Sequence, residues 1–289
     1  MQKASNEGFS SLAASRGLGN ISIMKLLGLF TLLAFTISWA FWAPVIALRL
    51  HTTQTPAGAI LFLLGGFGPS VAGAIFIVRG SGGRELVSRI FSPRRIGLLE
   101  ITVALFAYPA VFAASVGISR LFGAGAPGFA GLAGMLASPG PFIGNVALVV
   151  ILGPLSEEVG WRGYALEEAQ TRYAPILASL MLGVIWWAWH LPLFFMEGTL
   201  QESQGLLSAF TVGYLFTVLG YSGLFTWLYN RSSRSILVAV VAHFSVNMTI
   251  AMASPFDGSI FAIATVLLLV GVTGIFLIDR GAASAAHRS

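Results

Sequence analysis

Long runs of apolar residues dominate the pattern of this sequence, and each run is bounded by charged residues or by clusters of Gly and Pro. A helix needs about 20 consecutive apolar residues to cross a bilayer. Eight runs approach this length, at residues 26–48, 57–78, 98–121, 142–166, 174–195, 206–229, 236–254 and 260–278. The pattern predicts an all-α fold, a polytopic transmembrane helix bundle with about eight spans.

Composition supports the same class. Of the 289 residues, 56% are hydrophobic and only 9% are charged, whereas soluble domains carry about 25% charged residues. Eight spans use nearly the whole chain, so we expect one transmembrane domain at residues 23–280, between a disordered cytoplasmic tail at 1–22 and a second cytoplasmic tail at 281–289. The chain contains no Cys, which excludes disulfides, thiolate nucleophiles and cysteine metal sites.

Basic residues fall on alternate sides of the predicted spans. Fourteen of the 16 Lys and Arg, with Arg162 of the fourth span among them, are assigned to one side, and only Arg49 and Arg120 to the other. The net charge of +5 is therefore a topology signal and no sign of nucleic-acid binding. Because cytoplasmic loops are enriched in Lys and Arg, both termini are predicted to be cytoplasmic.

Two segments are rich in small residues. Residues 123–141, rich in Gly, Ala and Pro, predict an outer loop or a partly re-entrant stretch. They include a GxGxxG pattern, but no strand precedes it, so a dinucleotide site is disfavoured. The second predicted span has a small-residue face, for which close helix packing is the expected use: Gly65, Gly66, Gly68, Ser70, Gly73 and Ala74.

A short set of polar residues interrupts the spans. Polar and ionisable side chains at membrane depth are costly unless they face a cavity or a partner, so each is a functional candidate. The fourth, fifth and seventh spans contain them: Glu157, Glu158, Arg162, His190, His243 and Asn247.

Helical periodicity sorts the charges of the fourth span. Glu158 and Arg162 are four residues apart and can pair on one face. Glu157 points about 100° away, so its carboxylate is left free and is suited to proton transfer. The alternative is that all three form one buried ion network that only stabilises the bundle.

The histidines lie at comparable depths in their spans. His190 shares a helix face with Trp186 and precedes Pro192, which is expected to bend or end the fifth span. His243 and Asn247 are four residues apart and face one side of the seventh span. Counting residues from the cytoplasmic turns brings both histidines to a level near that of Glu157, so the set is predicted to converge.

This set of residue types suits hydrolysis of a peptide carbonyl. A free carboxylate and a histidine can hold and deprotonate a water, and a second histidine and an amide can stabilise an oxyanion. A zinc site made of Glu157, His190 and His243 is an alternative, although the HExxH spacing of common zinc peptidases is absent.

Three ordered motifs resemble those of the CPBP (CAAX protease and bacteriocin-processing, or ABI) family of intramembrane proteases, which includes the eukaryotic Ras-converting endoprotease. Residues 157–163 match EExxxRG, residues 186–190 match FxxxH with Trp186 in place of Phe, and residues 243–247 match HxxxN. The resemblance covers a catalytic core of about 140–255.

The resemblance implies roles for these residues. Glu157 would activate the attacking water with His190, and His243 with Asn247 would form the oxyanion hole. Glu158, Arg162 and Trp186 would support the site. We expect no cofactor, with zinc as the alternative.

The resemblance also implies partners and a location. The partners would be the lipid bilayer and a membrane-anchored or prenylated peptide or protein substrate, without nucleic acid. Short loops suit a multi-pass protein of a cell membrane, the inner membrane of a prokaryote.

Two other functions use the same residues. One is a proton-coupled transporter, which would need a polar path across both leaflets, whereas five of the spans are nearly free of polar residues. The other is a non-catalytic immunity or binding protein of the same family. Retention of all four expected catalytic residues argues against the second.

Overall fold

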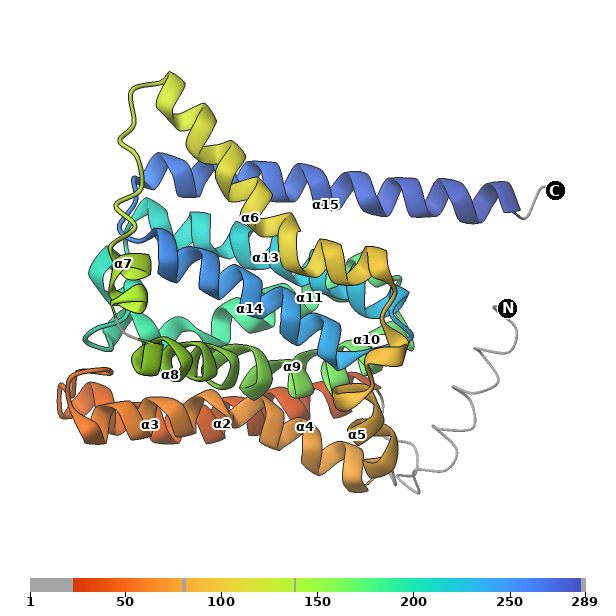
Figure 1. Ribbon diagram of the computed structural model, residues 1–289. Coiled ribbons are helices and arrows are strands. Elements are labelled where there is room, and N and C mark those ends of the chain that lie inside the picture. Colours follow the sequence, from red (N-terminus) through yellow and green to blue (C-terminus); the bar gives the residue numbers. More distant parts are fainter. Residues whose placement is uncertain (1–22, 80–81, 138, 287–289) are drawn as a thin grey trace.

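Helices form all the regular secondary structure in the part of the chain that the structure describes, so the predicted all-α class is confirmed. The computed structural model describes residues 23–79, 82–137 and 139–286. The predicted tail at 1–22 lies outside these residues. Figure 1 shows that most of the long helices run alongside one another, with α2, α3 and α4 on one side of the bundle and α6 and α15 on the other.

Seven helical segments are long and apolar enough to cross a membrane, which makes this a multi-pass membrane protein. They correspond to seven of the eight predicted runs. Their elements are α2 (Ile23–Ala47), α3 (Pro56–Gly66) with α4 (Gly68–Arg79), α6 (Leu98–Leu121), α11 (Pro175–Trp189) with η4 (Leu191–Phe195), α13 (Ala209–Arg231), α14 (Ile236–Ala253) and α15 (Gly258–Ala286).

The predicted fourth span is helical but interrupted. Two π-helical turns, η2 (Ile151–Leu155) and η3 (Trp161–Ala165), alternate with short α-helices. Such π-turns inside helices are frequent at functional sites. Pro154 in η2 has no N–H to donate, which accounts for the first break. With five charged residues this segment differs from the seven apolar spans, and its crossing of the membrane stays a prediction. The segment comprises α8 (Pro139–Val150), η2 (Ile151–Leu155), α9 (Ser156–Gly160), η3 (Trp161–Ala165) and α10 (Leu166–Gln170).

Small residues of α4 pack closely on α9, as the small-residue face predicts. A Cβ built on Gly160 would collide with the backbone carbonyl of Pro69, and one on Gly73 would collide with Gly160. The Ser70 hydroxyl donates to the carbonyl of Leu155 at 3.1 Å. Side chains larger than hydrogen at Gly73 and Gly160 would not permit this close approach of α4 to α9. The approach fixes the position of the segment that contains Glu157 and Glu158.

Hydropathy alone missed several short helices. They are α5 (Gly83–Phe91), η1 (Pro93–Arg95), α7 (Ala130–Leu136) and α12 (Leu200–Gln204). The helix α7 lies in the predicted loop 123–141, where Gly131 approaches α14 and its N–H donates to the carbonyl of Ser254 at 3.3 Å. The last helix continues to Ala286, beyond the predicted boundary at residue 280, because the Ala-rich sequence that follows favours helix.

A polar cluster joins the basic turns at one end of the bundle. The carboxylate of Glu167 accepts from Arg89 at 2.9 Å, from Arg234 at 3.0 Å and from the Tyr229 hydroxyl at 2.6 Å. The guanidinium of Arg95 donates to the carbonyl of Ser233 at 2.8 Å. Basic residues far apart in sequence thus share one end, as the charge pattern predicts; the side of the membrane on which this end lies stays a prediction.

Candidate active site

Glu157 lies at the start of α9 with only 5% of its surface exposed. One carboxylate oxygen, Oε2, accepts a hydrogen bond from the indole N–H of Trp186 at 2.6 Å. Among the described residues no Lys or Arg forms a salt bridge with it, in agreement with the expectation from helical periodicity. Its carboxylate is therefore held in place by an indole and not neutralised by a cation.

Glu158 is fully buried and has two partners. Arg162 Nη1 lies 3.0 Å from its carboxylate, which is the predicted pair. Its Oε1 atom is also 2.8 Å from Nδ1 of His243, a contact that sequence reasoning missed. Since a carboxylate only accepts, Nδ1 of His243 is the donor, and the Nε2 atom is left for other contacts.

His190 forms the C-cap of α11, where the helix ends before Pro192 as predicted. Its Nδ1 atom lies 2.8 Å from the carbonyl oxygen of Trp186. Because a carbonyl only accepts, Nδ1 carries the proton, and Nε2 of the neutral ring is an acceptor. Aromatic rings of Trp189 and Tyr214 pack against the imidazole, with centroids at 4.7 and 5.8 Å.

Groups from two helices, α9 and α14, surround the space beside Gly153. A Cβ built on this glycine would lie 2.7 Å from Asn247 Nδ2, 3.6 Å from His243 Nε2 and 3.7 Å from Glu157 Oε1. The absence of a side chain at Gly153 therefore allows a carboxylate, an imidazole and an amide to approach the same point. Sequence reasoning missed Gly153, although it lies four residues before Glu157 and so shares its helix face.

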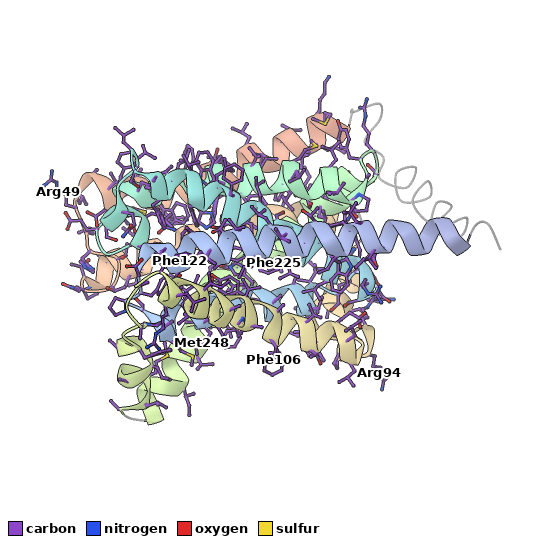
Figure 2. The ribbon with its side chains drawn as sticks, turned by 90° about the horizontal axis from the view of Figure 1, so that it is seen from above. Arg49, Arg94, Phe106, Phe122, Phe225 and Met248 are labelled. Carbon is purple, nitrogen blue, oxygen red and sulfur yellow. The ribbon has the colours of Figure 1, made fainter. Side chains whose placement is uncertain are left out.

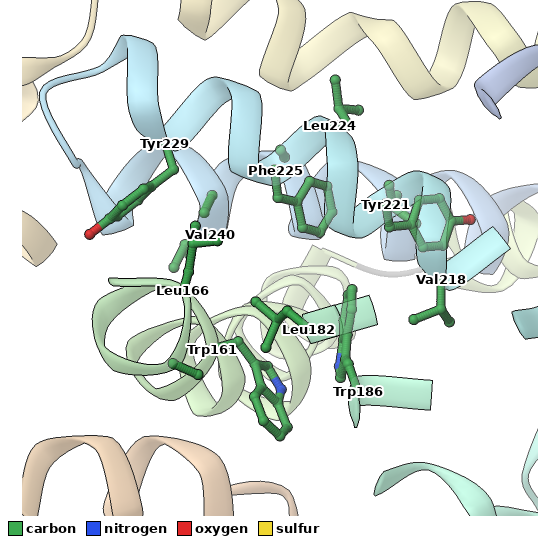
Figure 3. Close-up of a cluster of buried hydrophobic side chains, with 14 of the residues drawn as sticks. Trp161, Leu166, Leu182, Trp186, Val218, Tyr221, Leu224, Phe225, Tyr229 and Val240 are labelled. Atoms are coloured by element: carbon green, nitrogen blue, oxygen red, sulfur yellow. The ribbon is translucent and has the colours of Figure 1, made fainter. Parts of the chain in front are cut away.

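The ring of Trp186 connects this space to His190. Its centroid lies 5.8 Å from that of His190 and 5.4 Å from that of His243, and its N–H holds Glu157. Figure 3 shows Trp186 in the same buried cluster as Leu182 and Phe225. All the candidate residues thus belong to one constellation, in surroundings where hydrogen bonds are strong because water is largely excluded.

The guanidinium of Arg162 is enclosed by aromatic rings. It lies over the rings of Trp186 and Phe225, at 4.7 and 5.0 Å from their centroids. Cation–π contacts and the Glu158 carboxylate together offset the cost of burying this charge. Arg162 and Glu158 are thereby held in contact with Trp186 and His243, and their supporting role stays a prediction.

The same residues do not fit the zinc alternative in this structure. Among the described residues, no three His, Asp or Glu side chains form a group that could hold a metal ion. A zinc site needs at least three protein ligands at about 2 Å from the metal. The absence of a cofactor itself stays a prediction.

Known proteins share the segment that contains the site. Residues 139–249 match the family model described as type II CAAX prenyl endopeptidase Rce1-like. The chain is similar to CAAX prenyl protease 2 of Methanococcus maripaludis, at 31% identity over 152 residues, which are 52% of this chain and 55% of that relative. It thus spans about half the length of the curated relative that it matches. The resemblance of the three motifs to the CPBP family of CAAX proteases is therefore confirmed, over the segment that contains Glu157, His190, His243 and Asn247.

Proposed function

We propose that the protein is an intramembrane endopeptidase that hydrolyses a peptide bond with a water activated by glutamate and histidine. The observation that carries the proposal is the convergence of Glu157, His243 and Asn247 on the space beside Gly153. The cell membrane, as the inner membrane of a prokaryote, is the proposed location.

Glu157 and His190 are the groups that activate the water. Oε2 of Glu157 is occupied by the Trp186 indole, so Oε1 takes a proton from the water as its oxygen attacks the carbonyl carbon. Nε2 of His190 accepts a hydrogen bond from the second O–H of the water. It is free to do so because the proton of the ring is on Nδ1, which donates to the carbonyl of Trp186. The proton on Glu157 then passes to the leaving amine as the C–N bond breaks, and the carboxylate is restored.

His243 and Asn247 stabilise the oxyanion of the tetrahedral intermediate. The amide of Asn247 donates through Nδ2, which faces the space beside Gly153. Nε2 of His243 donates to the oxyanion from the doubly protonated ring, whose Nδ1–H is bonded to the carboxylate of Glu158 at 2.8 Å. Loss of one such donor typically costs a factor of about 10²–10³ in kcat.

The proposed substrate is a membrane-anchored or prenylated peptide or protein. The name of the relative and the description of the matched family both refer to prenylated CAAX substrates. A groove of about 570 Å³ along α2 and α11 has an almost wholly apolar lining, which includes Leu32 and Ile185, and suits an apolar chain. At one end of it, the indole of Trp39 donates to the carbonyl of Trp189, the neighbour of His190.

The test is proteolysis by the purified protein in detergent on a panel of prenylated and non-prenylated membrane-anchored peptides. Glu157→Gln is expected to lower kcat by about 10²–10⁴ because it removes the general base. Glu197→Gln, at an exposed position outside the site, is the matched control and retains activity. Cleavage by Glu157→Gln at the wild-type rate would overturn the mechanism, and proton transport without hydrolysis would favour a transporter.

A further inference from the structure

The helix α5 is amphipathic and lies at one end of the bundle, between the end of α4 and the beginning of α6 (Figure 1). Leu86 and Arg89 are buried on its inner face. Arg84, Val87 and Phe91, at helical spacings of three and four residues, form its exposed face. Both flanking helices are membrane spans, so this face lies where a bilayer begins.

Four arginines of α5 and η1 divide into two pairs. Arg89 and Arg95 bind carboxylates of the protein, Glu167 at 2.9 Å and Glu85 at 3.0 Å. The guanidiniums of Arg84 and Arg94 are exposed and have no hydrogen bond or ion pair with any described residue. The first pair attaches the segment to the bundle, and the second pair is available to an external anion.

Apolar side chains accompany the two free arginines. Phe91 is 70% exposed, and Leu98 at the start of α6 is 84% exposed. Figure 2 shows Arg94 at the end of the bundle opposite to Arg49. A surface that combines exposed aromatic and aliphatic groups with unpaired arginines is complementary to a bilayer with anionic headgroups.

We propose that the exposed face of α5 and η1 is a docking surface for anionic phospholipids. Arg84 and Arg94 bind the phosphate-containing headgroups, and Val87, Phe91 and Leu98 contact the acyl region beneath them. Ion pairs between these two arginines and lipid phosphates would hold α5 parallel to the membrane surface.

The docking surface is connected to the candidate active site through one residue. On the inner face of α5, Arg89 Nη1 donates to the carbonyl of Gly163 at 3.4 Å, and its guanidinium pairs with Glu167. Gly163 is the last residue of the EExxxRG motif. Lipid bound on the outer face of α5 therefore stabilises the helix that holds the end of this motif.

The experiment measures lipid binding and needs no enzymatic activity. Phosphatidylglycerol, and separately phosphatidylcholine, is titrated into the full chain in neutral detergent, and thermal unfolding is followed by tryptophan fluorescence. Stabilisation reports binding to the folded state. The double variant Arg84→Gln/Arg94→Gln is compared with Arg49→Gln/Arg120→Gln, which removes two exposed arginines outside the docking surface.

Wild type and the control are expected to be stabilised by phosphatidylglycerol more than by phosphatidylcholine. Each arginine near an anionic surface contributes roughly a fivefold gain in affinity, so Arg84→Gln/Arg94→Gln is expected to need about 25-fold more phosphatidylglycerol for half the effect. An unchanged response of this variant overturns the proposal. Equal stabilisation by the two lipids, or by inorganic phosphate alone, also overturns it, because the first excludes a charge-selective site and the second identifies a free anion as the ligand.

Discussion

Gly153→Ala tests whether the space between the candidate catalytic groups is where the reaction occurs. The new methyl group would lie 2.7 Å from Nδ2 of Asn247, whereas ordinary contact begins at 3.4 Å, so the amide must move by about 0.7 Å. The same methyl group would be in ordinary contact with His243 and Glu157, at 3.6 and 3.7 Å. Misplacement of a catalytic group by about 1 Å can cost 10²-fold in rate, so we expect kcat to fall by about 10- to 100-fold.

The assay is steady-state cleavage of the best peptide from the panel, together with thermal unfolding. Gly144→Ala is the matched control, because this glycine lies in α8, the helix before the π-turn that contains Gly153, and its added methyl group would meet no atom within 4 Å. Alanine favours helix over glycine by about 0.5–1 kcal/mol, so neither variant should unfold. A Gly153→Ala protein with wild-type kcat would refute the placement of the reacting carbonyl beside Gly153.

Three further predictions follow from single contacts. Trp186→Phe keeps a ring but removes the N–H that donates to Glu157. Since hydrogen bonds to charged groups contribute about 1.5–3 kcal/mol, kcat should fall by roughly 10-fold or more. A variant with wild-type kcat would show that this hydrogen bond is dispensable. Treatment with a chelator should leave cleavage unchanged, and a loss that zinc restores would contradict the metal-free mechanism. Gly160→Ala should destabilise the fold by about 1–3 kcal/mol, since its methyl group meets the backbone of Pro69. The control Gly28→Ala, whose methyl group meets no atom within 4 Å, should leave the stability unchanged. Equal melting temperatures of the two variants would contradict the close packing of α4 on α9.

The spans could be predicted because each depends on a local property of the sequence. The helix α6 has the predicted bounds, 98–121, since its apolar run alone decides where it lies in the bilayer. The short helix α5 escaped prediction because it has too few apolar residues to resemble a span. Its stability comes from Leu86 and Arg89 packing on other helices, and such tertiary contacts leave no long hydrophobic run.

Contacts within one helix were predictable, and contacts between helices were not. The spacing of Glu158 and Arg162 determines that they can pair, whatever surrounds them. The bond from His243 to Glu158 joins residues 85 apart in sequence. It depends on the rotation and height of α14 relative to α9, which close packing at positions such as Gly160 sets. Residue counting gave a common depth for the groups but not which atoms would meet.

The two adjacent glutamates have different surroundings because they are neighbours on one helix. Neighbours on a helix point about 100° apart, so the two carboxylates cannot face the same partners. Glu158 accepts from Arg162 and from Nδ1 of His243, whereas Glu157 accepts from an indole and approaches Gly153. These surroundings fit the proposed roles, in which Glu158 orients an imidazole and Glu157 accepts and returns a proton. Glu157 cannot replace Glu158 in orienting His243, because to reach His243 Nδ1 it would have to leave the face on which it approaches Gly153.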